Sequence, residues 1–334
     1  MVFFNKKDKL QIIAFQCYGT DTHIYARGRA LEDEQIGLAE KGILKLIINT
    51  WKRFGTDEVR NTGLTLRLPD GRTVVGMTDN DGYYLLDEPS ENLRALTNEE
   101  GWLPYEISYN DTSLKREILH QNRFPGEVLI PSKKAEYGVI SDIDDTIIHT
   151  GVASFLKWRA VFNTFFKNAG SRSPLKGAAN FYHLLHRGKT GKGVNPIFYV
   201  SHSPWNLYRY LEFFLKENNF PKGPILLRSF STIFQRKTAS EKPQKQKEII
   251  NILKTYPELS FILIGDSGEH DADIYIEIAQ AHPDRILAIY LRSVTHQKKM
   301  TRIRGLFEAY KTTPVLLVEN SEQAIEHARE NGFI

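Results

Sequence analysis

Acidic side chains gather at two points of the chain, each directly after a short apolar run. One run begins at Tyr137 and ends in DIDDT at residues 142–146, and the other, at residues 261–264, ends in GDSGEHD at residues 265–271. Apolar runs too short for helices indicate buried parallel strands, and open α/β sheets bind their ligands at the carboxyl ends of such strands. Carboxylates crowded there repel one another unless a cation neutralises them. The sequence therefore predicts a cation site, with Mg²⁺ as its simplest occupant.

The spacing of Asp142 and Asp144 predicts a nucleophile and a proton donor. Residues i and i+2 of an extended strand leave it on the same side, so the two carboxylates are expected to share one pocket. One carboxylate can attack phosphorus to form an aspartyl phosphate, while a second acid protonates the leaving oxygen and later activates water. We expect Asp142 to be the nucleophile and Asp144 the acid/base. Thr146 would fix the loop or orient Asp144, and Asp145, which has the opposite parity, would form the turn.

The second acidic run supplies the remaining metal ligands of this prediction. Asp266 would complete an oxygen-ligand Mg²⁺ site together with Asp142 and the backbone carbonyl of Asp144. Asp271 would be an outer partner of the same ion. The predicted ligands thus come from two strands that lie far apart in the sequence.

A third apolar run, residues 197–201, ends in a hydroxyl. Ser201, with the exposed backbone amides before the next helix, is expected to bind phosphate oxygens. Ser203 is expected to cap a helix over residues 204–219, because serine before proline is typical of a helix start. His202 is open between a hydrogen bond to the substrate and a surface position without a catalytic role.

Phosphoryl transfer also needs a fixed positive charge. Lys242, Lys245 and Lys247 all precede or open one predicted helix, and their spacing from the acidic runs does not choose among them. Arg228 ends another apolar run. It would grip an anionic head group or form a salt bridge at the end of the sheet.

Residues 1–134 predict a smaller β domain of accessory role. Short apolar runs such as residues 10–15 and 64–68 alternate with turn residues, which is typical of a β-sandwich, here of immunoglobulin-like or transthyretin-like type. The sequence PDGR at residues 69–72 is expected to join two strands as a hairpin, because proline presets φ and glycine accepts a positive φ. Apolar residues at helical spacing predict one helix over residues 36–51.

Residues 135–334 predict an α/β domain. Strands and helices alternate there, which indicates a Rossmann-like parallel sheet flanked by helices. Helices are expected over residues 204–219 and 244–256. Strands are expected at residues 139–141, 197–201, 225–228, 261–265, 286–290 and 315–318.

Composition limits the function classes. With 334 residues, 41% hydrophobic and 25% charged, the chain has the composition of an ordinary globular protein, and its length predicts two domains. The basic residues are scattered and no base-reading module is present, so nucleic acid is not an expected partner. The sole cysteine, Cys17, favours a reducing compartment. Neither a signal peptide nor an apolar stretch of about 18 residues is found, so we expect a cytoplasmic protein, at most peripheral to a membrane.

The motifs, in this order on alternating strands, resemble the haloacid dehalogenase superfamily of phosphohydrolases. Residues 137–151, 198–207, 223–228 and 264–271 further resemble the catalytic domain of actin patch protein 1-type phosphatidate phosphatases, a family with many uncharacterised bacterial members. The resemblance implies a haloacid dehalogenase-type fold, Mg²⁺ as cofactor, and hydrolysis of phosphatidate to diacylglycerol and phosphate. In that family the phosphate-binding lysine follows a histidine; the corresponding position is Lys245, with Gln244 in place of the histidine. His202 stands where the family often has a small residue.

The segment between the first two motifs is short and basic. Its roughly fifty residues are too few for a large folded cap, given a usual domain size of ~100 residues. We therefore expect an open active site that an acidic phospholipid surface can approach, although ordinary solvated helix faces would carry the same charges. The basic residues are Lys157, Arg159, Lys167, Arg172, Lys176, Arg187, Lys189 and Lys192.

Two other functions are alternatives to a phospholipid phosphatase. A related phosphatase could act on a phosphoprotein, a nucleotide or a sugar phosphate, because the motifs report the phosphoryl group and not its carrier. A non-catalytic adaptor is the remote alternative. A chain without catalysis has no physical reason to keep Asp142, Asp144 and Asp266 crowded together.

Overall fold

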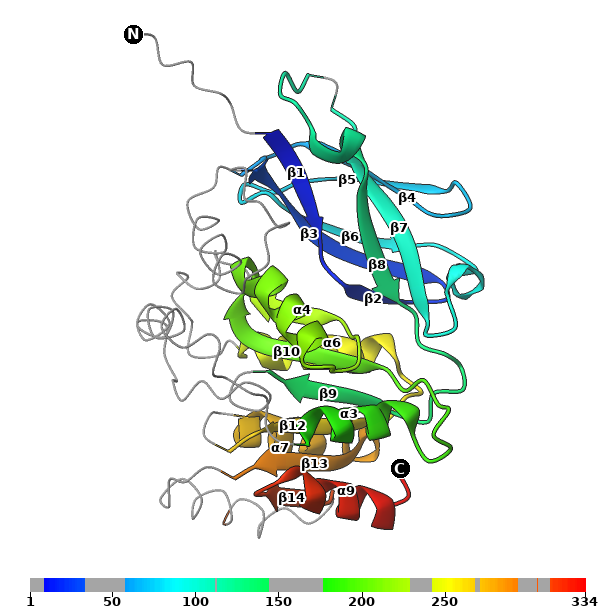
Figure 1. Ribbon diagram of the computed structural model, residues 1–334, viewed down its shortest axis with the longest axis vertical. Coiled ribbons are helices and arrows are strands. Elements are labelled where there is room, and N and C mark those ends of the chain that lie inside the picture. The colour runs from blue at the N-terminus through cyan, green and yellow to red at the C-terminus, as the bar shows by residue number, and fades with distance from the viewer. Residues whose placement is uncertain are drawn as a thin grey trace. The chain divides into compact units, whose positions relative to one another are not determined.

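The protein is described by a computed structural model covering residues 9–33, 58–111, 113–143, 177–228, 242–267, 271–293, 305 and 313–334. The chain divides into two compact units, Met1–Ile130 and Pro131–Ile334, close to the boundary expected at residue 134. We refer to them as the N-terminal unit and the C-terminal unit, and Figure 1 shows the strands and helices of each.

The N-terminal unit is a β domain whose eight described strands form one hydrogen-bonded sheet in the order β1-β3-β2-β8-β7-β4-β5, with β6 paired to β3. Among the described strands every pairing is antiparallel except that of β2 with β8. The β content expected for this part is confirmed, and its closure into a sandwich stays a prediction. The strands are β1 Lys9–Ala14, β2 Cys17–Thr20, β3 His23–Asp33, β4 Gly63–Arg67, β5 Thr73–Met77, β6 Tyr83–Pro89, β7 Trp102–Tyr109 and β8 Phe124–Leu129, with 3-10 helices η1 Leu93–Leu96 and η2 Leu119–Asn122.

Alternation along the strands builds the core of this unit. In β4, Leu64 and Leu66 are fully buried while Thr65 between them is only half-buried, and in β7 Leu103 and Ile107 are fully buried. Successive strand residues point to opposite faces, so each of these strands gives one apolar face to the core. The helix expected over residues 36–51 lies outside the described residues.

The predicted hairpin at residues 69–72 is confirmed. It joins β4 to β5, which pair antiparallel with Arg67 opposite Thr73. Gly71 has a φ of +89°, and the Asp70 carboxylate accepts a hydrogen bond from the backbone N–H of Arg72 at 3.1 Å. Turn chemistry local to these residues therefore sets the register of the hairpin.

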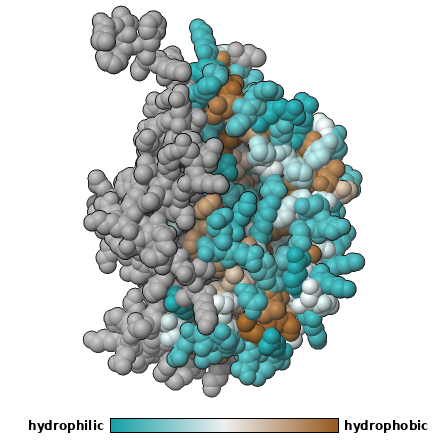
Figure 2. Space-filling view, viewed as in Figure 1, coloured by the Kyte–Doolittle hydropathy of each residue, from teal (hydrophilic) through white to brown (hydrophobic). Residues whose placement is uncertain are grey.

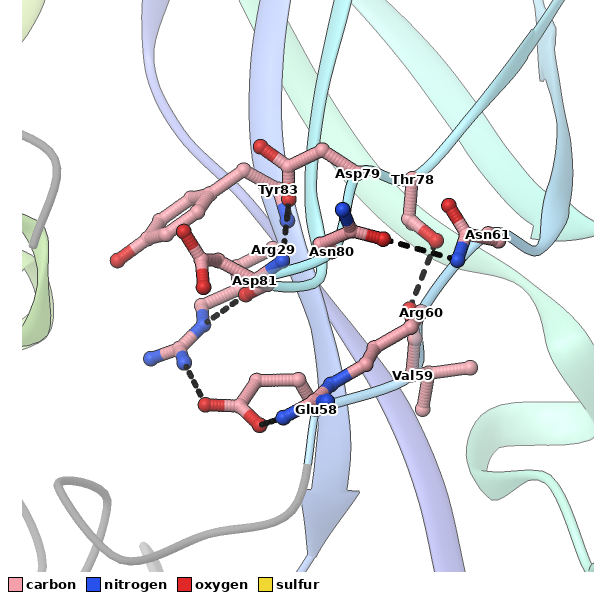
Figure 3. A network of polar contacts seen from close by, with 10 residues as sticks. All are labelled: Arg29, Glu58, Val59, Arg60, Asn61, Thr78, Asp79, Asn80, Asp81 and Tyr83. Atoms are coloured by element: carbon pink, nitrogen blue, oxygen red, sulfur yellow. Dashed lines mark hydrogen bonds and ion pairs between the residues drawn. The ribbon is translucent and has the colours of Figure 1, made fainter. Parts of the chain in front are cut away.

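A polar network ties β3 to the turn between β5 and β6 (Figure 3). Arg29 donates hydrogen bonds to the backbone carbonyl of Asp81 at 3.1 Å and to the carboxylate of Glu58 at 3.0 Å. Asp79 Oδ1 accepts from the backbone N–H groups of Asp81 and Tyr83, both at 2.8 Å. The guanidinium of Arg29 also lies 4.8 Å from the ring centroid of Tyr83, whose pKa is raised to about 12 by burial. The network thus links β3 to Glu58 and to the turn between β5 and β6 within the β domain.

The C-terminal unit contains a six-stranded parallel sheet in the order β11-β10-β9-β12-β13-β14. This is the order of a doubly wound α/β sheet, in which the direction of strand addition reverses between β9 and β12. The strands are β9 Gly138–Asp142, β10 Ile197–Pro204, β11 Ile225–Arg228, β12 Phe261–Asp266, β13 Ile286–Arg292 and β14 Val315–Val318. The helices are α3 Ala178–Arg187, α4 Tyr208–Glu217, α6 Gln244–Thr255, α7 Asp271–Ala281 and α9 Ser321–Glu330, with 3-10 helices η3 Trp205–Leu207 and η4 Pro283–Arg285.

Helices cover both faces of this sheet (Figure 1). On β9, Ser141 hydrogen-bonds Tyr182 of α3, while the next residue, Asp142, hydrogen-bonds Lys245 of α6. Because successive strand residues point to opposite faces, α3 and α6 lie on opposite sides of the sheet. The predicted α/β architecture of this part is thus observed.

The predicted helix start at Pro204 is wrong. Strand β10 continues through Pro204, and the α-helix begins only at Tyr208, after η3. The hydroxyl of Ser201 accepts a hydrogen bond from the backbone N–H of Ser203 at 2.8 Å, and the register with β11 shifts over these residues. The backbone N–H of Ser203 is thus taken up by a side chain, and Ser203 is a buried strand residue and not a helix cap.

On the face seen in Figure 2, the surface of the described residues is mainly hydrophilic, with small separate hydrophobic patches. Across the described residues, no helix combines the length and apolar character needed to cross a membrane.

Replacing Gly71 by alanine tests the hairpin. A Cβ at this position would meet nothing within 4 Å, so the only penalty is the positive φ. We expect Gly71→Ala to lower the free energy of unfolding by about 1–2 kcal/mol. Gly71→Asn should lose less stability, since asparagine tolerates the left-handed region. Urea unfolding measures the loss in both variants, and equal losses would show that the positive φ of Gly71 is not the cause.

Candidate active site

Three buried carboxylates meet at the carboxyl ends of the central strands. Asp142 is the last residue of β9, Asp266 is the last residue of β12, and Asp271 is the first residue of α7. One oxygen of each lies within 4.8 Å of the others, and the residues are at most 1% exposed. The cluster lies where the strand order reverses, which is where doubly wound sheets bind their ligands.

A lysine of helix α6 contacts this carboxylate cluster. Lys245, on the first turn of α6, is 1% exposed, and its Nζ donates to Asp142 Oδ1 at 2.7 Å and to Asp271 Oδ1 at 2.5 Å. Lys242 instead pairs with Glu277 at 3.1 Å on the surface, and Lys247 is exposed. Of the three lysines that spacing left open, only Lys245 has its ammonium among the carboxylates.

Charge balance in the cluster favours a divalent cation. Three ionised carboxylates and one ammonium leave an excess of two negative charges in a site that water hardly reaches. The donors are all carboxylate oxygens, which are the ligands that Mg²⁺ prefers. The residues present therefore fit the predicted cofactor.

Close packing of α7 on β12 brings Asp271 into the cluster. A Cβ on Gly265 would lie 2.6 Å from Asp271 Oδ2 and 2.8 Å from the ring of Tyr275, so only glycine fits there. The hydroxyl of Tyr275 donates to the backbone carbonyl of Ile264 at 3.0 Å, and Asp271 Oδ2 accepts from the backbone N–H of Asp266 at 3.4 Å. Burial raises the pKa of Tyr275 well above its usual value, so its hydroxyl stays a donor.

The other face of β9 is held by α3. The hydroxyls of Tyr182 and Ser141 lie 2.6 Å apart, and Ser141 Oγ also donates to the backbone carbonyl of Asp142 at 2.7 Å. Burial raises the pKa of Tyr182; the Ser141 hydrogen bond lowers it, and the negative charge of Asp142 raises it. Tyr182 therefore lies close enough to the cluster to respond to its charge.

The remaining predicted residues lie at neighbouring strand ends or outside the described chain. Ser201 is buried in β10 and His202, beside it, is half-buried. Arg228 ends β11, the edge strand, where burial lowers the pKa of its guanidinium and its Nε is buried without a hydrogen bond to any described residue. Asp144 and Thr146 lie outside the described residues, so their roles stay predictions.

Sequence reasoning missed two residues that support the site, Tyr182 and Gly265. Tyr182 lies within an amphipathic helix and carries no local signal of its contact with Ser141. Gly265 did carry a local sequence signal, because a glycine inside a buried strand often marks the close approach of another element.

The fold and the site define a doubly wound α/β protein with a buried acidic cluster at the topological switch point. Residues 137–293 match the family described as the catalytic domain of phosphatidate phosphatase APP1. The chain is 32% identical over 265 residues to phosphatidate phosphatase APP1 of Saccharomyces cerevisiae, covering 77% of this chain and 42% of that protein. It is 25% identical over 297 residues to the uncharacterized protein C29B5.04c of Schizosaccharomyces pombe, covering 87% of this chain and 45% of that protein.

The resemblance of the motifs to the catalytic domain of actin patch protein 1-type phosphatidate phosphatases is thereby confirmed over residues 137–293, and the wider resemblance to the haloacid dehalogenase superfamily stays a prediction. The described part of this matched range contains β9 to β13 together with Asp142, Lys245, Asp266 and Asp271. The chain spans less than half the length of either relative.

Replacing Gly265 by alanine tests the close packing of α7. The new Cβ would overlap Asp271 and Tyr275, so we expect Gly265→Ala to lower the free energy of unfolding by about 1–3 kcal/mol. Gly305→Ala is the control, because a Cβ there would meet nothing within 4 Å and should be neutral or stabilising. Urea unfolding compares them, and a neutral Gly265→Ala would contradict the packing argument.

Replacing Lys245 by methionine tests the buried ion pairs. The variant leaves Asp142 and Asp271 without their cation, so we expect a loss of about 3–5 kcal/mol in the free energy of unfolding at neutral pH. Lys242→Met removes a surface pair and should cost about 1 kcal/mol or less. Similar losses in the two variants, measured by urea unfolding, would show that Lys245 is not a buried counterion.

Proposed function

We propose that this chain is a Mg²⁺-dependent phosphomonoester hydrolase of the haloacid dehalogenase superfamily that acts on phosphatidate. The observation that carries the proposal is the buried cluster of Asp142, Asp266 and Asp271, with Lys245 bonded to two of them. The match of residues 137–293 to the APP1 catalytic domain supports the reaction class.

Asp142 is the proposed nucleophile. One of its oxygens forms a bond to phosphorus as the bond between phosphorus and the ester oxygen breaks. Asp144 gives its proton to the leaving alkoxide, which departs as an alcohol. In the second half of the reaction Asp144 takes a proton from water and the water oxygen bonds to phosphorus. The bond between phosphorus and the Asp142 oxygen breaks, which frees the Asp142 carboxylate and releases phosphate.

Lys245 is proposed to hold the nucleophile and to balance charge. Its ammonium lies 2.7 Å from Asp142 Oδ1, which fixes the direction of that carboxylate. The same charge would attract the phosphoryl oxygens and weaken their repulsion by Asp142. Ser201 follows Val200, the residue of β10 paired in register with Asp142, and is the proposed hydroxyl donor to those oxygens, with His202 and Arg228 as further substrate contacts.

Asp142, Asp266 and the backbone carbonyl of Asp144 are the proposed holders of Mg²⁺, with Asp271 as an outer partner. When bound, the ion would neutralise the excess negative charge and draw electron density from the phosphoryl oxygens. The carboxylates supply only oxygen donors, in keeping with this choice of metal.

Phosphatidate is the proposed substrate because the yeast relative carries that name. Its product would be diacylglycerol with free phosphate. A lipid substrate at an acidic membrane surface would also agree with the basic segment between the first two motifs. The N-terminal unit is proposed to have an accessory role in membrane or protein contact.

Exchange of Asp142 for asparagine tests the reaction. We expect Asp142→Asn to lower phosphate release from phosphatidate vesicles at least about a thousandfold, because the amide is not a nucleophile for phosphorus. Asp273→Asn is the matched control, since Asp273 lies in the first turn of α7 outside the cluster, and it should stay near wild type. Phosphate release is measured with Mg²⁺ and after chelation, and activity that survives chelation would contradict the metal dependence.

The same assay on a phosphopeptide, a nucleotide and a sugar phosphate addresses the substrate. Hydrolysis of these soluble esters without hydrolysis of phosphatidate would overturn the lipid assignment and leave the proposed chemistry intact. Undiminished turnover by Asp142→Asn would overturn the chemistry.

A further inference from the structure

The backbone of Asp142 is held unevenly by its two neighbouring strands. The register of β9 with β10 continues to the pair of Asp142 with Val200. Among the described residues, its register with β12 ends one position earlier, at Ser141. The proposed nucleophile, the last residue of β9, thus lies beyond the ladder on the β12 side. Its position on that side depends on contacts other than the ladder.

A pair of buried hydroxyl groups supplies such a contact. Ser141 Oγ donates a hydrogen bond to the backbone carbonyl of Asp142 at 2.7 Å, and the hydroxyls of Ser141 and Tyr182 lie 2.6 Å apart. Because the single hydroxyl proton of Ser141 goes to the carbonyl of Asp142, Tyr182 is the donor to Ser141 Oγ. Burial raises the pKa of Tyr182, so its hydroxyl keeps its proton. The hydroxyl pair of Tyr182 and Ser141 therefore leads from α3 to the backbone of Asp142.

The ring of Tyr182 is itself fixed by packing. It packs edge to face on Phe220 with ring centroids 5.3 Å apart, and it stacks on Tyr199 with centroids 6.4 Å apart. Tyr182 is 2% exposed and Ser141 is fully buried, so water hardly competes for their hydrogen bonds. The packing around α3 thus sets the direction of the hydroxyl pair.

We propose that Tyr182 and Ser141 are positioning residues that fix the backbone of the nucleophile from the face of the sheet opposite Lys245. The inference deepens the proposed function and rests on it, because it takes Asp142 as the nucleophile. Lys245 bonds the carboxylate of Asp142 on one face, and the hydroxyl pair bonds its backbone carbonyl on the other. Attack on phosphorus needs an aligned oxygen, and a misplacement of about 1 Å can slow a reaction about a hundredfold.

Removal of the hydroxyl of Tyr182 tests the proposal. In Tyr182→Phe, Ser141 loses the partner that directs its proton, so the backbone of Asp142 gains freedom. We expect kcat for phosphatidate to fall about tenfold while KM changes less than about twofold, because the hydroxyl pair acts on the nucleophile and not on the bound substrate. Phosphate release at a series of phosphatidate concentrations gives both constants, and an unchanged kcat would overturn the inference.

Tyr199→Phe is the matched control, because it removes a hydroxyl of the same kind that does not bond the nucleophile strand. Tyr199 is fully buried, and its hydroxyl donates to the backbone carbonyl of Pro221 at 2.7 Å. We expect the two variants to lose similar stability in urea unfolding and only Tyr182→Phe to lose kcat. An equal fall of kcat in both would reflect a general loss of stability and would also count against the positioning role.

A double variant tests whether the two hydroxyls act in series. Ser141→Ala removes the bond to the carbonyl of Asp142 and should lower kcat at least as much as Tyr182→Phe. Adding Tyr182→Phe to Ser141→Ala should change kcat by less than about twofold, because no serine hydroxyl is left for Tyr182 to direct. Losses that multiply would show that the two residues act independently and would overturn the inference. If Ser141→Ala does not fold, the comparison of Tyr182→Phe with Tyr199→Phe decides.

The inference and the proposed function fail in different ways. If the wild-type chain hydrolyses phosphatidate and Tyr182→Phe has the same kcat, the proposed function stands and the positioning role falls. If the wild-type chain hydrolyses no ester, the proposed function falls and the positioning role falls with it.

Discussion

The buried ion pairs of Lys245 are the interaction on which the site of the C-terminal unit depends. Asp142, Asp266 and Asp271 lie within 4.8 Å of one another and are almost fully buried, so solvent does little to screen their repulsion. Lys245 offsets part of that repulsion through bonds of 2.7 and 2.5 Å. Because the four residues come from β9, α6, β12 and α7, the charges are balanced only when all of these elements are in place.

Close packing on both faces of the sheet holds this arrangement. Gly265 lets α7 approach β12, and Tyr182 ties α3 to the strand that carries Asp142. The same two residues line a cavity of about 250 Å³ in the C-terminal unit. The residues that pack α3 and α7 onto the sheet thus also line this cavity.

Local signals predicted most of the elements of the C-terminal unit. The strands at residues 225–228 and 315–318 were predicted with their observed bounds, and helix α6 ends one residue before its predicted end. These predictions succeeded because a buried parallel strand is a short apolar run and an amphipathic helix has its own period. The predicted start of the helix after β10 was wrong, because β10 continues through Pro204 and the α-helix begins only at Tyr208.

The sequence by itself determined which carboxylates end the central strands, since an acidic residue after an apolar run is a local pattern. Only the tertiary structure showed that Lys245, and not Lys242 or Lys247, contacts the carboxylates, because the face of α6 that meets the sheet is set by packing. The roles of Gly265 and Tyr182, and the cavity between three strands and two helices, were likewise decided in three dimensions. The contact between Lys245 and Asp142, 103 residues apart, leaves no spacing in the sequence from which it can be inferred.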